Sequence, residues 1–225
     1  MESCIIESGE GIILQGRIFK PSAGKDVNIG TAVVLVHPYS KLGGCQGLMQ
    51  GIALRLSLKG FISITFDMRG VGRSTGRSTL TGYQEIEDVV SVCKWVSQNL
   101  SVKNILLVGS SAGATTAGSA VDKVEEVKGF ASIGYPFGLA ASIIFGRHHK
   151  AILKSPKPKL FILGTEDEFT SIQQLERKLM SAAGRVQAHF VVGVGHFQME
   201  GPAYDARMAD LISSFIPSLL HSPSI

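Results

Sequence analysis

Continuous apolar runs alternate with amphipathic segments along most of the chain. Stretches rich in β-branched residues, such as 31–37 (TAVVLVH), predict strands that are buried on both faces of a sheet. Segments with apolar residues at helical spacing, such as 83–100, follow these strands. Near the N-terminus, the segments 3–7 and 11–19 flank SGEG and predict an antiparallel hairpin. The pattern therefore begins with a hairpin and continues as alternating strands and helices.

The same alternation extends to the end of the sequence. Further strands are predicted at 61–67, 104–109, 127–135, 157–164 and 186–193, and further helices at 45–60, 112–121, 170–184 and 202–220. The stretch 138–157 is expected to be irregular. Strand–helix alternation implies an α/β fold with a mostly parallel central sheet that helices flank on both faces. We expect a single domain over 1–225, with its ligand site beyond the carboxyl ends of the strands.

Composition and charge narrow the function classes. The chain has 225 residues, is 44% hydrophobic and carries a net charge of +4, but its Lys and Arg residues are scattered. No basic run is interleaved with aromatic residues, so we expect no nucleic-acid partner. The three distant cysteines (Cys4, Cys45 and Cys93) argue against a disulfide framework and against zinc. With no signal-like start and no apolar run of roughly 18 residues, we expect no membrane partner and a cytoplasmic protein.

The stretch LLVGSSAGATT (106–116) leaves a predicted strand through small residues and enters a predicted helix. Its GSSAG segment matches G-x-S-x-G with Ser111 at the centre, a pattern that lifts a serine hydroxyl clear of the sheet on a strained turn. A plain glycine-rich turn is the alternative. A phosphate-binding loop is not indicated, because no Gly-Lys-Ser/Thr follows. Ser111 is therefore predicted to be a nucleophile.

A serine hydroxyl needs a base to accept its proton. Of six histidines, His196 in VGVGHFQMEG follows the last predicted strand and can reach the carboxyl edge of the sheet. The acidic turn GTEDEF also leaves a strand, and Asp167 within it is our choice for the carboxylate that orients His196. Glu166 and Glu168 are rivals, and a solvated turn that caps the next helix is the alternative for all three. The chain order serine, acid, histidine favours a triad.

An oxyanion hole needs two backbone N–H groups. Ala112, directly after the serine, supplies one. The loop HPYSKLGG after the first core strand can supply the other, and because Pro38 has no N–H, the donor would be Tyr39. His37 is then expected to shape this loop rather than to act as a base.

Together, HPYSKLGG, FDMRGVGRSTG (66–76), GSSAG, GTEDEF and GVGHF resemble the α/β-hydrolase fold superfamily, in that superfamily's order and over nearly the whole chain. The closest group is small serine hydrolases with His-Pro in the oxyanion loop. The resemblance implies a Ser111–His196–Asp167 triad, with Tyr39 and Ala112 as oxyanion donors. Many members have an Asp-x-Arg-Gly-x-Gly-x-Ser loop, which matches here as Asp67, Arg69, Gly70, Gly72 and Ser74. Pro38 departs from the glycine that is commoner at this position of the oxyanion loop.

Many members of the superfamily insert a helical cap, whereas here only a short cap-like or flap-like insertion, residues 136–158, fills that position. It predicts one short helix or a flap at most, and therefore an open site. Apolar residues of this insertion are candidates for an acyl-binding surface, or for a simple cover of the sheet edge: Leu139, Ile143, Ile144 and Phe145.

The sequence thus predicts a serine hydrolase that cleaves carboxylic esters or related small acyl compounds through an acyl-enzyme. The mechanism implies no metal and no organic cofactor. An acylpeptidase, a thioesterase or an acyltransferase would use the same residues. A ligand receptor or scaffold with slow or no turnover on the same fold is the alternative from a different class.

Overall fold

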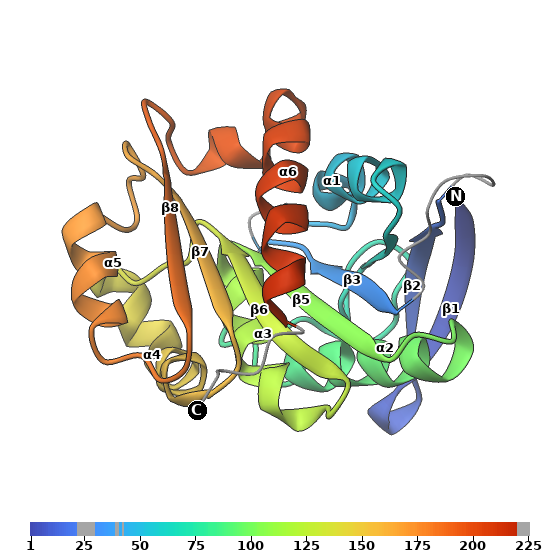
Figure 1. Cartoon of the computed structure of the whole chain (residues 1–225). Helices are drawn as coiled ribbons and strands as arrows, with labels where there is room; N and C mark the ends of the chain where they lie inside the picture. Colours follow the sequence, from blue (N-terminus) through green and yellow to red (C-terminus); the bar gives the residue numbers. More distant parts are fainter. Residues whose placement is uncertain (22–29, 39–40, 42, 220–225) are drawn as a thin grey trace.

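The computed structural model (Figure 1) describes residues 1–21, 30–38, 41 and 43–219. In this part of the chain, one eight-stranded sheet has the order β1-β2-β4-β3-β5-β6-β7-β8. The strands are β1 (Glu2–Ser8), β2 (Ile12–Phe19), β3 (Thr31–Val36), β4 (Ile62–Phe66), β5 (Asn104–Ser110), β6 (Val127–Ile133), β7 (Lys159–Gly164) and β8 (Val186–Val191). The pairs β1–β2 and β2–β4 are antiparallel, and all others are parallel. The predicted hairpin and the mostly parallel sheet are therefore confirmed.

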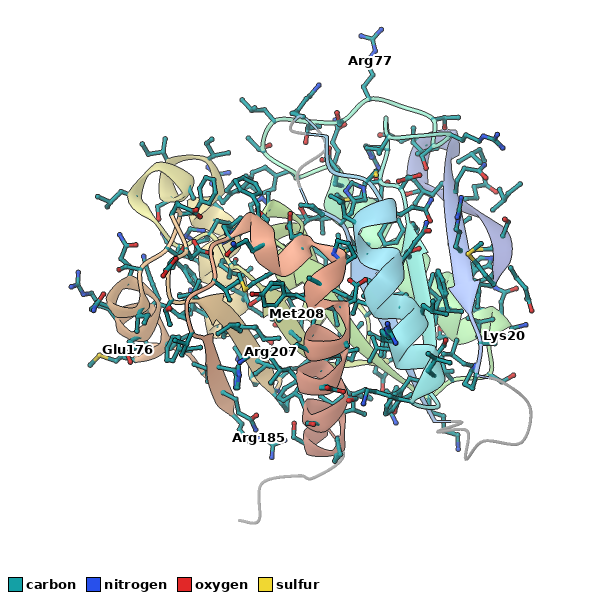
Figure 2. The ribbon with its side chains drawn as sticks, turned by 90° about the horizontal axis from the view of Figure 1, so that it is seen from above. Lys20, Arg77, Glu176, Arg185, Arg207 and Met208 are labelled. Carbon is teal, nitrogen blue, oxygen red and sulfur yellow. The ribbon has the colours of Figure 1, made fainter. Side chains whose placement is uncertain are left out.

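Helices cover both faces of this sheet (Figure 1). They are α1 (Gly47–Leu58), α2 (Glu85–Asn99), α3 (Ala112–Ala120), α4 (Leu139–Lys154), α5 (Ile172–Leu179) and α6 (Asp205–Phe215). The helices α1 and α6 lie side by side over one face (Figures 1 and 2), and the other four lie over the opposite face. The single-domain α/β fold expected from the sequence is therefore present.

The central strands are apolar at every position because successive side chains enter different cores. In β3, Val33 and Leu35 pack with α1 and α6, whereas Val34 and Val36 pack with the helices of the opposite face. All four side chains are fully buried. The continuous apolar run that predicted a two-sided strand thus has a direct structural cause.

The expectation of an irregular stretch over 138–157 is wrong, because α4 occupies Leu139–Lys154. Among the side chains of α4 that the structure describes, the buried ones are Phe145, His148, His149 and Ile152, which recur at helical spacing. Two of the four are histidines, which an apolar pattern does not count. The inward face was therefore invisible to hydrophobic periodicity.

Two other predicted helices are shorter in the structure, one because of a tertiary contact and the other because of a proline. Predicted over 170–184, α5 ends at Leu179, and the amide of Ala183 donates to Leu153 O at 2.8 Å instead of continuing the helix. Predicted over 202–220, α6 spans Asp205–Phe215. Pro217, which has no amide hydrogen to donate, follows its end.

The carboxyl ends of the parallel strands converge at one edge of the sheet. The strand β5 leads directly into Ser111, β7 leads into the turn with Asp167, and β8 leads into the loop with His196. Three residues that lie far apart in the sequence are thereby delivered to one place. Across the described ranges, none of the helices combines the length and the apolar character that crossing a bilayer requires.

Candidate active site

Ser111 has a strained backbone between β5 and α3. Its φ is 50° and its ψ is −128°, a conformation that non-glycine residues rarely adopt. Such strain costs about 1–3 kcal/mol and persists only where neighbours hold it. Here the amide of Ser111 donates to Ile133 O, and the amide of Ala114 donates to Ser111 O, each at 2.9 Å. The turn therefore holds the serine at the end of the sheet.

The glycines on either side of this serine are required by close backbone packing. A Cβ atom on Gly109 would lie 2.4 Å from Ala114 Cα, and one on Gly113 would lie 2.0 Å from His37 O. Real Cβ atoms do not approach backbone atoms so closely. The G-x-S-x-G pattern is thus explained by the tight contact of α3 with β5 and with the end of β3.

The His196 ring lies against Ser111. Its Nε2 is 2.8 Å from Ser111 Oγ, and the histidine is only 2% exposed. Gly134 makes room for the ring, because a Cβ atom there would lie 2.8 Å from His196 Cε1. The Phe169 ring packs edge-on against the imidazole, with centroids 4.6 Å apart. The imidazole is thus held at the serine from several sides.

Asp167 completes the row of hydrogen bonds. Its Oδ2 is 2.6 Å from His196 Nδ1, while its Oδ1 accepts from the amides of Phe169 (2.9 Å) and Thr170 (2.8 Å). Of the two rival carboxylates, Glu168 accepts instead from the backbone amide of His196, and Glu166 is exposed. Only Asp167 of the three bonds the ring, and its orientation is fixed by backbone donors.

The first oxyanion candidate, Ala112, is the first residue of α3, where a helix leaves its amide without an intrahelical partner. The second, Tyr39, lies outside the described residues. His37, just before that loop, is fully buried and accepts from the Met68 amide through Nε2 at 3.1 Å, while its Nδ1–H donates to Pro38 O at 2.6 Å. Burial lowers the pKa of His37. A neutral His37 ring whose two nitrogens both form hydrogen bonds with backbone groups fits the structural role expected from the sequence.

The loop that follows β4 contacts His37, just after the end of β3, through the amide of Met68. Arg69 forms a buried bidentate ion pair with Asp88 of α2, with Nη2 2.8 Å from Oδ1, and its own amide also donates to Asp88. Asp67 accepts from the amide and the side chain of Gln46, each at 2.8 Å. The motif residues Asp67 and Arg69 therefore fix the loop that carries the Met68 donor to His37.

A cleft of about 310 Å³ opens beside Ser111. The described residues that line it are Pro38, Gly44, Leu48, Ser111, Phe197, Glu200, Gly201 and Pro202. Ser110 Oγ donates to Glu200 Oε1 at 2.5 Å, which links the end of β5 to the histidine loop. Burial raises the pKa of the Glu200 carboxyl, while the bond from Ser110 and the nearby His196 act to lower it.

The apolar residues predicted for acyl binding do not line this cleft. Leu139 and Ile143 point to solvent, with 83% and 87% of their surfaces exposed, and Ile144 is also exposed. Phe145 is buried and lines a much smaller void behind Ala112. In the described residues, no group of three or more His, Cys, Asp or Glu side chains is arranged to hold a metal ion.

Sequence reasoning missed Glu200, Leu48 and Phe197 as residues of the cleft. A signal for Glu200 was present, since it stands four residues after His196 in GHFQME. No comparable signal marked Leu48, which comes from a helix far away in the sequence.

The sequence also matches a known protein family. The model of the X-Pro dipeptidyl-peptidase (S15) family matches residues 10–155, which is more than half of the chain. The chain belongs to this family. The match contains Ser111 and ends before Asp167 and His196, so the S15-family likeness covers the nucleophile half of the site. No curated protein matches the chain by sequence.

Solved structures show the same fold for this S15-family chain. An α/β serine hydrolase homologue from Coxiella burnetii is 24% identical with a TM-score of 0.78, covering 95% of this chain and 96% of its own. XC6422 from Xanthomonas campestris, an α/β serine hydrolase without a lid, is 23% identical with a TM-score of 0.79, covering 99% and 96%. The esterase Pf2001 of Pyrococcus furiosus is 19% identical with a TM-score of 0.75, covering 96% and 92%. Of these three proteins, XC6422 is described as lacking a lid, in line with the minimal cap expected from the sequence.

Proposed function

We propose that this chain hydrolyses carboxylic esters of small acyl groups with Ser111 as nucleophile, His196 as general base and Asp167 as its orienting carboxylate. The observation that carries the proposal is the unbroken row of hydrogen bonds from Ser111 Oγ through the His196 ring to Asp167. A nucleophile bonded to a base that is itself oriented by a third group is the arrangement that activates a serine.

In the first half-reaction, His196 Nε2 takes the proton of Ser111 as Oγ forms a bond to the ester carbonyl carbon. The negative charge on the carbonyl oxygen is met by the Ala112 amide, and by the Tyr39 amide if that residue faces the site as the motif predicts. The tetrahedral intermediate then breaks its bond to the alkoxy oxygen. That oxygen leaves as an alcohol with the proton from His196, and the acyl group stays on Ser111.

In the second half-reaction, His196 takes a proton from a water molecule, whose oxygen attacks the acyl carbon. The bond to Ser111 Oγ breaks, and the serine recovers its proton from the imidazolium. The free acid is released. Asp167 stabilises the imidazolium in both halves, because its carboxylate is fixed by two backbone amides and bonds Nδ1–H.

The test joins a covalent probe to a substrate panel. A fluorophosphonate probe should label wild-type protein and fail to label Ser111→Ala, and the wild type should hydrolyse 4-nitrophenyl acetate and butyrate. Because the family is named after an X-Pro dipeptidyl-peptidase, an Xaa-Pro 4-nitroanilide is tested as a second kind of substrate. Faster cleavage of that amide than of either ester would replace the esterase with a peptidase. Folded wild type that neither labels nor turns over would refute the hydrolase and favour a binding protein.

A further inference from the structure

Apart from the Ser111 hydroxyl and one carboxyl group, the described residues that line the cleft beside Ser111 present apolar side chains or backbone. Pro38, Leu48, Phe197 and Pro202 contribute apolar surface, and among its described residues Glu200 is the only charged side chain. Ligand sites commonly combine apolar walls with a few polar groups that fix the orientation of the ligand. A carboxyl group in such a wall is costly unless its oxygens find hydrogen-bond donors.

Glu200 has one of its oxygens satisfied by the protein. Ser110, which is fully buried and directly precedes the nucleophile, donates its hydroxyl hydrogen to Oε1. No described residue donates a hydrogen bond to the other oxygen, Oε2. A carboxylate accepts several hydrogen bonds, so Glu200 keeps capacity for a donor that enters the cleft. The contact with Ser110 also places this acceptor next to the residue that attacks the substrate.

We infer that Glu200 binds a hydroxyl group on the acyl part of the substrate, so that the preferred substrates are hydroxyacyl esters. The inference rests on the proposed function, since it names the substrate class of the same site. The hydroxyl donates to the free oxygen of Glu200, while the carbon chain lies against the apolar walls. Glu200 thereby selects substrates that have a hydrogen-bond donor close to the carbonyl that Ser111 attacks.

A hydroxyl fits this position better than an ammonium group. Glu200 lies close enough to His196 for the two charges to interact, and His196 becomes an imidazolium in each transition state. The negative charge of Glu200 stabilises the His196 imidazolium. An ammonium group bound to Glu200 would neutralise that charge and would place a second cation beside the imidazolium. A neutral hydroxyl leaves the negative charge of Glu200 in place. Among the described residues, the titratable groups whose charges act on Glu200 are His196 and Asp167.

The experiment compares three 4-nitrophenyl esters on the same carbon chain: butyrate, 3-hydroxybutyrate and 3-aminobutyrate. A hydrogen bond to a charged acceptor contributes about 1.5–3 kcal/mol, so kcat/KM for the hydroxy ester should exceed that for butyrate by about ten- to a hundredfold. A ratio near one would overturn the inference, and so would a higher kcat/KM for the amino ester. Equal rates on the esters would refute only this inference. Failure to cleave any ester, together with failure to label Ser111, would refute the proposed function itself.

Variants assign the preference to Glu200. In Glu200→Leu, the ratio of the hydroxy ester to butyrate should fall to about one. The ratio is taken within each protein, so a general loss of active enzyme cancels. A ratio that survives in Glu200→Leu would overturn the role of Glu200.

Glu176 provides the matched control. It is exposed on α5, at the periphery of the molecule (Figure 2), and does not line the cleft. Glu176→Leu makes the same chemical change away from the site, and the ratio of the two esters should stay at the wild-type value. A fall in this control equal to that in Glu200→Leu would contradict a local contact.

Discussion

Asp167 Oδ2 lies 2.6 Å from His196 Nδ1, and neither side chain is more than 2% exposed. The aspartate is itself held by two backbone amides from its own turn. A carboxylate fixed in this way selects the histidine tautomer that has its free Nε2 lone pair toward Ser111.

Replacing this carboxylate should therefore abolish most activity without unfolding the protein. For Asp167→Asn we expect kcat on 4-nitrophenyl butyrate to fall by about a thousandfold to ten-thousandfold, because the amide favours the wrong tautomer. Glu166→Gln is the control, since that side chain is exposed in the same turn. A loss in Glu166→Gln as large as in Asp167→Asn would contradict the assignment. Steady-state kinetics, with circular dichroism to verify folding, measure both.

The contact between α3 and the end of β3 predicts a steric effect at Gly113. The methyl group of Gly113→Ala would meet His37 O at 2.0 Å, so the helix must shift and the serine turn with it. We expect the free energy of unfolding to fall by about 1–3 kcal/mol, and we expect a large loss of activity.

Gly146 is the matched control for this substitution. It lies inside α4, and nothing lies within 4 Å of the position of its absent Cβ. Gly146→Ala should stabilise the protein by up to about 1 kcal/mol, because alanine favours helix. Urea titration compares the two variants, and equal effects would argue against the clash.

Removing one partner of the buried pair Arg69 and Asp88 should lower the free energy of unfolding by a large amount. Both side chains are nearly inaccessible, at 6% and 0% exposed. Asp88→Asn leaves the guanidinium without its counter-charge, at a cost of about 3–5 kcal/mol. The exposed pair of Lys59 and Asp210 is the comparison, and Asp210→Asn should cost less than about 1 kcal/mol. Chemical denaturation at pH 7 tests both, and a similar cost for the two would contradict the importance of burial.

Lys159 should make stability depend on pH in the alkaline range. It is fully buried, donates to Ser155 O and Ala183 O, and burial lowers its pKa to about 8. Between pH 8 and about 10.5 the unfolded chain binds more protons at this residue than the folded chain, so this residue's contribution to the unfolding free energy rises with pH. The gain is at most about 3 kcal/mol and is absent below pH 8, where both states are protonated.

The raised pKa of the buried thiol of Cys4, about 11, acts in the opposite direction in this range. The measurement is therefore the difference in unfolding free energy between wild type and Lys159→Met as a function of pH, in which other groups cancel. A difference that stays constant from pH 8 to 10.5 would show that Lys159 titrates normally.

Much of the fold was predictable because β-branched runs and helical periodicity reflect burial directly. The strand β3, with side chains in both cores, shows this relation. Hydrophobic periodicity did not reveal α4, because two of its described buried side chains, His148 and His149, are polar. It also overextended α5, whose end is set by the contact of Ala183 with Leu153.

The site shows the same division. Motif order predicted Ser111, Asp167 and His196, since each follows a strand whose carboxyl end lies at one edge. The cleft could not be predicted, because Leu48 and Glu200 meet there only through packing of α1 and of the loop after β8. The exposure of Leu139 and Ile143 likewise depends on how α4 is rotated against the sheet.

The sequence by itself determined the alternation of strands and helices, the small residues around Ser111 and the chain order of the chemical groups, because these depend on local sterics and on periodic burial. Only the tertiary structure decided which carboxylate bonds the imidazole, which side chains form the cleft and where Glu200 is held. Those outcomes depend on distances between segments far apart in the chain, and no local pattern encodes such distances.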